Sequence, residues 1–504
     1  MSDFELFYGM LEDMPYCFGL SQLENLESIG VNRVRRIPGF DYRGSGIIIG
    51  FVDTGIDYTH PVFVQADGSN RVQVIWAQSE ENGTLPEGFG FGGLFGPEEI
   101  ETGTAPKDEN GHGTFLAGIA AGREDRENNF SGVAPLAELA VVKLREAPQE
   151  LKEYFCMPPG TVAFSEADIM QGVRFLLEYA AAREKPLALC LGVCCSLGSH
   201  RGTLPLSLYL NSLAYRPDVC LITAVGNEGN ARHHAGLTLT DSQQEAEIYV
   251  GTRGSGFTAE IFAEAIAEVN LRIISPAGDT TPVLGSGFTG TERFPLLFDR
   301  SVLYVERESL MRTDTVQRIR LRFERPSTGI WRLQFGRSDM NQEVNMWLPI
   351  SEFLEGEVYF LEPDSEVTLC EPANAPQLLA VGGYSVENES PAPFSGRGFT
   401  ADGLNQPTLL APAVNVQGPF AGGGYITKSG TSIGAAYTAG VVALFLEYIE
   451  EYRRTGSVAP LDTVVLRNLF SLGAIREEGT EYPSPVYGYG GLNLYGVFEF
   501  LRNL

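Results

Sequence analysis

The stretch T-K-S-G-T-S-I-G-A-A-Y-T-A-G at residues 427–440 turns a Gly/Ser-rich loop into a helix, with Ser432 in its first turn. From Ile433 to Ile449, apolar residues recur at i, i+3, i+4 and i+7, which predicts a helix with one buried face. At such a helix start, unpaired backbone N–H groups and the positive dipole end favour an oxyanion formed when the serine oxygen attacks a carbonyl. Serine is more commonly an N-cap at this place. This stretch alone leaves two roles open for Ser432, a catalytic nucleophile and an N-cap.

Two other segments supply the partners that a nucleophilic serine needs. G-I-I-I-G-F-V-D-T-G-I-D at 46–57 is a continuous apolar run, typical of a buried parallel strand, and it reaches Asp53 before a Gly turn. N-G-H-G-T-F-L-A-G-I-A-A-G at 110–122 places His112 at the start of a small-residue helix. At such positions Asp, His and Ser can form a catalytic relay, in which Ser is the nucleophile, His is the base and Asp orients the His. His60 is the rival base, but it precedes a proline, and we expect it to shape the turn.

The chain order of these residues is Asp, His, Ser, which is the order in subtilisin and differs from chymotrypsin and the α/β-hydrolases. D-T-G-I-D, G-H-G-T-x-x-A-G and G-T-S-x-x-A-A-x-x-A-G resemble the three signature blocks of the subtilisin-like serine proteases, the S8 family. A fourth block, V-C-L-I-T-A-V-G-N-E-G-N at 219–230, resembles the family as well. The resemblance implies a catalytic triad of Asp53, His112 and Ser432, and an oxyanion hole made by Asn227 and the Ser432 backbone N–H.

The resemblance also implies where a peptide substrate binds. Two short segments would form the walls of the pocket for the residue before the scissile bond, and the backbone of the first would pair with the substrate. These are Ser196, Leu197 and Gly198 on one side, and Ala224, Val225 and Gly226 on the other.

The predicted mechanism is acyl transfer from peptides by a serine endopeptidase, which needs no cofactor and no metal. Adjacent His233 and His234 suggest a metal at first sight, but neighbouring side chains diverge and the spacing completes no ligand set. Calcium stabilises many subtilases, yet we assign no loop of this chain to it.

The pattern of elements predicts an α/β fold with a central parallel sheet, and the resemblance implies the subtilisin-like three-layer arrangement around it. Strand runs at 139–144 and 187–193 flank a helix pattern at 168–183, as in βαβ units. From 238 to 370 the sequence changes to short runs in which apolar and polar residues alternate. These runs predict an inserted antiparallel β-sandwich, jelly-roll-like, and the segment has a plausible size for a domain. We therefore expect a lead-in at 1–45 and a catalytic domain at 46–237 and 371–504. Residues 89–96, with four glycines, are expected to form a loop near the site mouth.

The short lead-in, the large β insertion and G-N-E-G-N-A-R-H-H resemble the clostridial spore-germination, or Csp-type, branch of the subtilases. That resemblance implies limited proteolysis that activates another protein. It also implies an alternative, a catalytically silent pseudoprotease that acts as a sensor or scaffold, because some relatives have lost triad residues. An esterase that uses the same relay is a further rival. The resemblance also implies a folding prodomain as a partner, which we do not expect within this chain. Either the sequence is a processed form, or the enzyme folds without that helper.

The amino-acid composition limits the classes of binding partner and the cellular compartment that we expect for this protein. With 36 Lys and Arg against 64 Asp and Glu, the net charge of −28 argues against nucleic acid or an anionic membrane as a partner. The first residues lack the basic and apolar regions of a signal peptide, and we see no membrane span. Seven cysteines without framework spacing favour a reducing compartment, so we expect a cytoplasmic or spore-associated protein. Four of them lie on or beside strand runs, where we expect small buried hydrophobes: Cys190, Cys194, Cys195 and Cys220.

Overall fold

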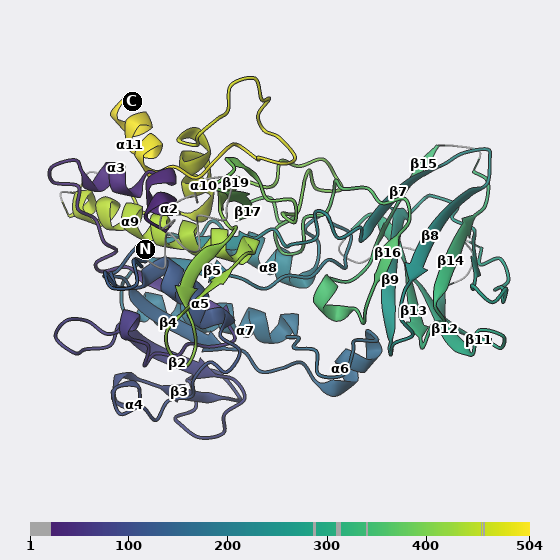
Figure 1. Ribbon diagram of the computed structural model, residues 1–504, viewed down its shortest axis with the longest axis horizontal. Coiled ribbons are helices and arrows are strands. Elements are labelled where there is room, and N and C mark those ends of the chain that lie inside the picture. The colour runs from purple at the N-terminus through teal and green to yellow at the C-terminus, as the bar shows by residue number, and fades with distance from the viewer. Residues whose placement is uncertain are drawn as a thin grey trace, which may run out of the picture.

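The structure is a computed structural model, and it describes residues 22–285, 289–308, 314–338, 341–454, 456 and 459–503. Its long axis carries two parts side by side, an α/β part around a large sheet and a part made of antiparallel strands (Figure 1). The first 21 residues of the predicted lead-in, Cys17 among them, lie outside the described residues. From residue 22 the lead-in forms two short helices, α2 (Gln22–Ser28) and α3 (Val31–Arg35).

Nine of the described strands form one sheet, with the order β18-β17-β6-β5-β1-β4-β2-β3 and β19 paired to β17. The strands from β17 to β2 along this order run parallel, which confirms the predicted parallel core. Every residue of β1, β5 and β6 is buried, because helices cover both faces. The strands are β1 (Ile48–Asp53), β2 (Val72–Ala77), β3 (Gly93–Phe95), β4 (Glu138–Lys143), β5 (Leu187–Leu191), β6 (Val219–Ala224), β17 (Leu379–Ser385), β18 (Ser390–Pro391) and β19 (Leu409–Pro412).

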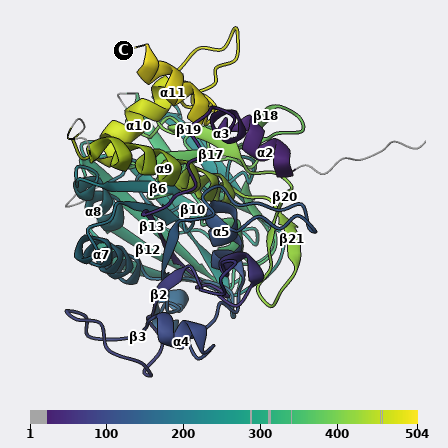
Figure 2. The same cartoon turned by 90° about the vertical axis from the view of Figure 1, so that its left-hand side faces the viewer.

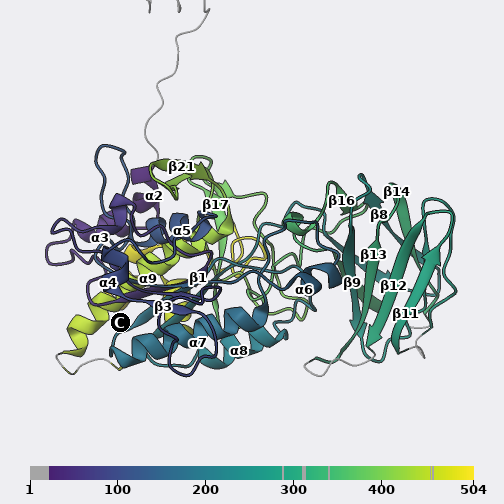
Figure 3. The same ribbon diagram turned by 90° about the horizontal axis from the view of Figure 1, so that it is seen from below.

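Helices on the two faces complete the predicted three-layer arrangement (Figure 3). On one face, α5 (His112–Ala121) and α9 (Thr431–Arg453) share a buried core with the sheet, and α2, α3, α10 and α11 pack around α9 (Figure 2). On the other face lie α7 (Glu166–Ala182) and α8 (Pro205–Leu213). The remaining helices are α4 (Pro97–Glu101), α6 (Gln149–Tyr154), α10 (Thr463–Leu472) and α11 (Leu494–Arg502), with 3-10 turns at η1 (Pro61–Phe63) and η2 (Ser351–Phe353).

Within the described residues, α9 alone is long and apolar enough to cross a membrane. However, 83% of its most apolar window is buried inside the protein. The apolar character of this helix therefore follows from its central place between the sheet and the surrounding helices.

The antiparallel part is a six-stranded sheet, β11-β12-β13-β9-β15-β7, and a four-stranded sheet, β10-β14-β8-β16, with one shared buried core. Burial alternates along β12, as the sequence pattern predicts for a sandwich strand. The first strand begins at His234, ahead of the predicted boundary at 238. The strands are β7 (His234–Leu239), β8 (Gln244–Val250), β9 (Gly256–Glu264), β10 (Leu271–Ile274), β11 (Gly290–Leu296), β12 (Ser301–Glu308), β13 (Val316–Glu324), β14 (Gly329–Phe335), β15 (Gln342–Trp347) and β16 (Val358–Phe360).

The glycine-rich segment 89–96 differs from its prediction as a loop at the site mouth. Its residues Gly93–Phe95 form β3, which pairs antiparallel with β2. Phe89 packs on Trp76 of β2 and on Phe175 of α7, with ring centroids 4.7 and 5.9 Å apart. The aromatic side chains thus cover the α7 side of the sheet edge, because Trp76 offers an apolar surface there.

A ring stack joins the two parts. Trp347, at the end of β15, lies between the imidazoles of His200 and His234, with ring centroids 4.1 and 4.9 Å away. All three side chains are buried. Burial lowers the pKa of His200 to about 3, and it lowers that of His234 as well. Both rings are therefore neutral in the folded protein near neutral pH.

Candidate active site

Asp53 is the last residue of β1, at the edge where the parallel strands end. Its side chain is only 1% exposed. The backbone N–H of Thr54 donates to Oδ1 at 2.7 Å, and the hydroxyl of Thr54 accepts from the N–H of Gly113 at 3.0 Å. The turn after β1 therefore fixes the carboxylate of Asp53 and ties it to the start of α5.

The start of α5 is held by Asp108. One oxygen of this carboxylate accepts from the N–H of Gly111 at 2.9 Å, and the other accepts from the N–H and the hydroxyl of Thr114, at 2.9 and 2.7 Å. A carboxylate at this end satisfies donors that lack partners within the helix and matches the helix dipole. As a result His112, the first residue of α5, has a fixed position relative to β1.

His112 joins the other two predicted triad residues. Its Nδ1 lies 2.8 Å from Oδ1 of Asp53, and its Nε2 lies 3.2 Å from Oγ of Ser432. The imidazole is about one-third exposed, at 32%, whereas the carboxylate behind it is buried. Burial acts to lower the pKa of His112, but the charge of Asp53 and its hydrogen bond outweigh burial, so the pKa is raised above 6.5.

Ser432 is the second residue of α9, and Thr431 beside it connects the helix to the segment after β6. The backbone N–H and the hydroxyl of Thr431 are 2.9 and 3.1 Å from Oδ1 of Asn227. Since Oδ1 accepts these bonds, the amide NH₂ of Asn227 faces away from Thr431 and stays able to donate. A β-carbon added to Gly430 would lie 3.6 Å from both Nδ2 of Asn227 and Oγ of Ser432. The amide and the hydroxyl therefore border one small space.

Polar groups of the first predicted substrate wall are bonded inside the protein. Ser196, Leu197 and Gly198 are buried, as is the second wall. The hydroxyl of Ser196 donates to the backbone oxygen of Leu348 at 2.7 Å, and the N–H of Gly198 donates to the carboxylate of Glu260 at 2.9 Å. Both partners belong to the antiparallel part, so contacts inside the protein occupy groups that we expected to bind substrate.

The partly exposed segment is the one just before it, residues 192–195. A β-carbon on Gly192 would lie 3.0 Å from Cε1 of His112 and 3.0 Å from Oδ2 of Asp53. Gly192 is thus in contact with the relay, and it follows directly after β5. Gly192 is not among the predicted site residues, although its place after a buried parallel strand, like that of Asp53, is a signal in the sequence.

The second predicted wall lies beside Asn227. Ala224, Val225 and Gly226 are buried, and the N–H of Gly226 donates to the Thr431 hydroxyl at 3.1 Å. A side chain at Gly226 would collide with Cys370, whose Sγ is 2.3 Å from the added β-carbon.

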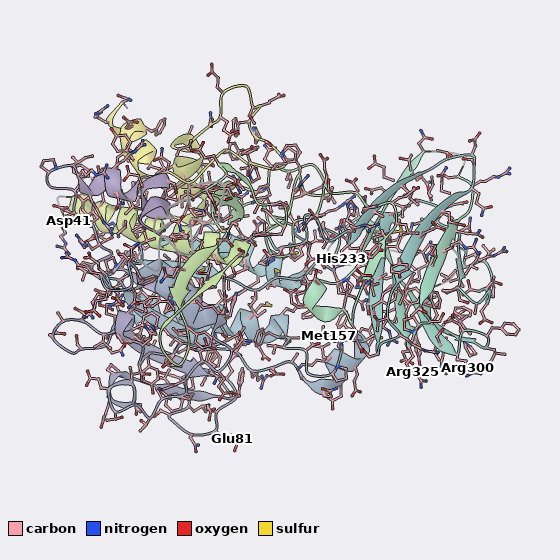
Figure 4. All side chains as sticks on the ribbon, viewed as in Figure 1. Asp41, Glu81, Met157, His233, Arg300 and Arg325 are labelled. Carbon is pink, nitrogen blue, oxygen red and sulfur yellow. The ribbon has the colours of Figure 1, made fainter. Side chains whose placement is uncertain are left out.

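The other histidines lie in different surroundings. His60 is buried, with Nε2 2.9 Å from the backbone oxygen of Gly424, and it caps η1. His233 pairs with the carboxylate of Glu228 at 2.5 Å and lies where the two parts of the protein meet (Figure 4). His234 pairs with Asn345 at 3.0 Å. No group of three or more His, Cys, Asp or Glu in the described part of the chain is arranged to hold a metal ion.

The fold, with the Asp53, His112 and Ser432 side chains at one edge of its parallel sheet, is of the subtilisin type, and comparison with known proteins agrees. Residues 44–251 and 361–490 match the subtilase family, which is more than half of the chain. The chain therefore belongs to the subtilase family. The match is interrupted between 251 and 361, where most of the antiparallel strands lie.

Among solved structures, the chain is similar to the CspB protease of Clostridium perfringens, with 26% identity and a TM-score of 0.83 over 95% of this chain and 98% of that one. Subtilisin-like protease SBT2.2 of Arabidopsis thaliana is 35% identical over 130 residues, which cover 21% of this chain and 15% of that protein. Minor extracellular protease Vpr of Bacillus subtilis is 21% identical over 91% of this chain and 52% of its own length. The chain thus spans about 15% of the plant relative and about half of Vpr.

Proposed function

We propose that this chain hydrolyses peptide bonds with Ser432 as nucleophile, His112 as general base and acid, and Asp53 as the group that orients the imidazole. The observation that carries the proposal is His112, bonded to Asp53 through Nδ1 and to Ser432 through Nε2, at 2.8 and 3.2 Å. Ser432 Oγ attacks the scissile carbonyl while His112 takes its proton, and His112 then gives that proton to the leaving amine. Water hydrolyses the acyl-enzyme in the same way.

The oxyanion of each tetrahedral intermediate would bind between the Asn227 amide and the Ser432 backbone N–H. The two bonds from Thr431 support this role, because they hold the Asn227 side chain before substrate arrives. Donors positioned in advance need no rearrangement when charge develops, which is why they lower the barrier.

For the peptide itself, we assign the first wall of the cleft to residues 192–195 in place of Ser196, Leu197 and Gly198, and we keep Ala224, Val225 and Gly226 as the second. The partial exposure of 192–195 and the contact of Gly192 with His112 support this shift by four residues. A peptide that adds as a strand gains main-chain hydrogen bonds with little demand on its own sequence.

The physiological role we propose is limited proteolysis that activates another protein, as in spore germination. The similarity to the CspB protease over nearly the full length of both chains supports it. We further propose a cytoplasmic or spore-associated location, since all six described cysteines are free thiols.

Active-site labelling tests the proposed activity. An alkyl fluorophosphonate probe should form one covalent adduct on the wild-type chain, mapped to Ser432 by peptide mass spectrometry. Ser432→Ala should abolish the adduct, whereas Ser429→Ala, which changes a serine of the same loop outside the relay, should keep it. Absence of an adduct on a folded wild-type chain would favour the silent scaffold. Turnover of a short ester with no turnover of casein or peptides would favour the esterase.

A further inference from the structure

Two cysteine side chains meet at the substrate wall beside the candidate oxyanion hole. A β-carbon placed on Gly226 would lie 2.3 Å from Sγ of Cys370 and 3.6 Å from Sγ of Cys194. The neighbouring side chain of Cys194 raises the pKa of Cys370, as expected for two thiols that lie close together. Since 176 positions of the sequence separate them, only the fold brings these sulfurs together.

Backbone pairing explains why they face one another. Cys195 and Glu371 form an antiparallel bridge in which each N–H donates to the other's oxygen, at 3.0 and 2.7 Å. Side chains alternate along extended strands, so Cys194 and Cys370 both project to the face opposite that of Cys195 and Glu371. They are diagonal neighbours across the bridge, a placement in which side chains reach each other.

The two thiols differ in access. Cys194 is partly exposed, whereas Cys370 is fully buried behind it. Cys195 is also partly exposed, but its Sγ–H donates to the backbone oxygen of Leu197, and burial raises its pKa to about 12. The prediction of small buried cysteines thus holds for Cys190 and Cys220 and is wrong for this pair at 194–195.

We propose that Cys194 and Cys370 form a reversible thiol modification site, oxidised by low-molecular-weight disulfides, whose oxidation blocks the substrate cleft. The site itself stands on the geometry of the two sulfurs. Its effect on catalysis rests on the proposed function, because Gly226 precedes Asn227 and is bonded to Thr431 beside Ser432.

The reaction has two balanced steps. The thiolate of Cys194 attacks one sulfur of a disulfide RSSR, so that a mixed disulfide forms and one RS⁻ leaves. The thiolate of Cys370 then attacks Sγ of Cys194 and expels the second RS⁻, which leaves an internal disulfide. In sum, two protein thiols and one RSSR give one protein disulfide and two RSH. An excess of small thiol reverses both steps.

The second step should be the slow one near neutral pH. The neighbouring side chain of Cys194 and burial both raise the pKa of Cys370, and the charges of Glu228 and Cys195 act in the same direction. The thiolate is the species that attacks the disulfide. When the pKa of a thiol is raised, only a small fraction is thiolate until the pH comes close to that pKa. The mixed disulfide on Cys194 should therefore accumulate at neutral pH, and the internal disulfide should form faster as the pH rises.

The experiment uses the full chain, reduced, freed of reductant and incubated with oxidised glutathione at about pH 7 and about pH 8.5, which lie below and at the ordinary cysteine pKa. Free thiols are then blocked, and peptide mass spectrometry locates each disulfide. Peptide hydrolysis is followed in parallel. We expect a Cys194 adduct, then a Cys194–Cys370 bond, with at least a tenfold loss of hydrolysis that dithiothreitol reverses.

Three variants sharpen the test. Cys194→Ala should lose its sensitivity to oxidised glutathione, and Cys370→Ala should stop at the mixed disulfide. Cys156→Ala, a buried cysteine outside this cluster, should behave as wild type. Reduced thiols at 194 and 370 after the incubation would overturn the proposal, and so would a disulfide that leaves hydrolysis unchanged. If the reduced protein cleaves no peptide, the proposed function fails, and disulfide mapping still decides whether the thiol site exists.

Discussion

Oδ1 of Asn227 accepts two hydrogen bonds from Thr431, one from the backbone N–H at 2.9 Å and one from the hydroxyl at 3.1 Å. Thr431 also receives the N–H of Gly226 at its hydroxyl and is followed by Ser432. One threonine thus fixes both the proposed oxyanion donor and the start of the helix that carries the proposed nucleophile.

Replacing the amide of Asn227 tests the proposed oxyanion hole. Asn227→Ala should lower kcat about 10²-fold to 10³-fold with little change in KM, the range measured on subtilisin itself, because the lost bond acts mainly in the transition state. Asn230→Ala, an exposed asparagine of the same loop, is the matched control and should stay near wild type. Equal losses in the two variants would contradict the role of Asn227.

The pH dependence of hydrolysis should follow His112. The base must be neutral to accept the proton of Ser432, so activity falls as pH drops through the pKa of His112. Because Asp53 raises this pKa, the midpoint of the acid limb of kcat/KM should lie above 6.5. Asp53→Asn should shift that midpoint to lower pH and reduce kcat about 10⁴-fold. If the midpoint of the acid limb of the wild type lay below pH 6.5, that result would contradict the pairing of His112 with Asp53.

Gly113 should resist substitution. An added β-carbon would lie 2.2 Å from the backbone oxygen of Gly55 and 3.2 Å from Oδ1 of Asp53, so the turn after β1 would have to move. Gly113→Ala should lower the free energy of unfolding by about 1–3 kcal/mol and reduce kcat. Gly90→Ala meets no atom within 4 Å and serves as the control. Urea unfolding measures both, and a Gly113→Ala protein as stable as the control would refute this contact.

The pair of Glu228 and His233 should be energetically coupled. Both side chains are buried, and the second oxygen of Glu228 accepts from the N–H of Ser351 at 3.2 Å. Alanine at either position leaves the other group buried without its partner. A double-mutant cycle of urea unfolding, with both single variants and the double variant, should give a coupling energy of about 0.5–3 kcal/mol. Additive effects would show that the two side chains act independently.

Acid should weaken the ring stack between the two parts of the protein. Burial lowers the pKa of His200 to about 3 from an ordinary 6.5, so below pH 6.5 the unfolded chain binds a proton that the folded protein does not. Stability from this group is complete above 6.5 and is lost as pH falls towards 3. His200→Phe keeps a ring against Trp347 and removes the titration. Between about pH 6 and about pH 4, its stability should fall less steeply than that of wild type, by up to about 1.4 kcal/mol per pH unit. Identical slopes would contradict the neutral state of His200.

The sequence pattern predicts the parallel core, and the resemblance of four motifs to the subtilisin-like serine proteases implies that Asp53, His112, Asn227 and Ser432 converge. Buried parallel strands are continuous apolar runs, so β1 and β6 can be predicted from their own stretches of sequence. The carboxyl ends of parallel strands lie at one edge of a sheet, which brings together residues that follow different strands. Local patterns therefore place Asp53 and Asn227 at that edge, where the two residues follow β1 and β6.

Tertiary contacts determine which polar groups around these residues are already bonded inside the protein. Glu260 and Leu348, from the antiparallel part, occupy polar groups of Gly198 and Ser196, and this moves the proposed wall to residues 192–195. Likewise, Cys194 meets Cys370 only through the bridge beside them. Such contacts join segments far apart in the chain, and the packing of two separate sheets sets them, so no periodicity or spacing in one segment encodes them.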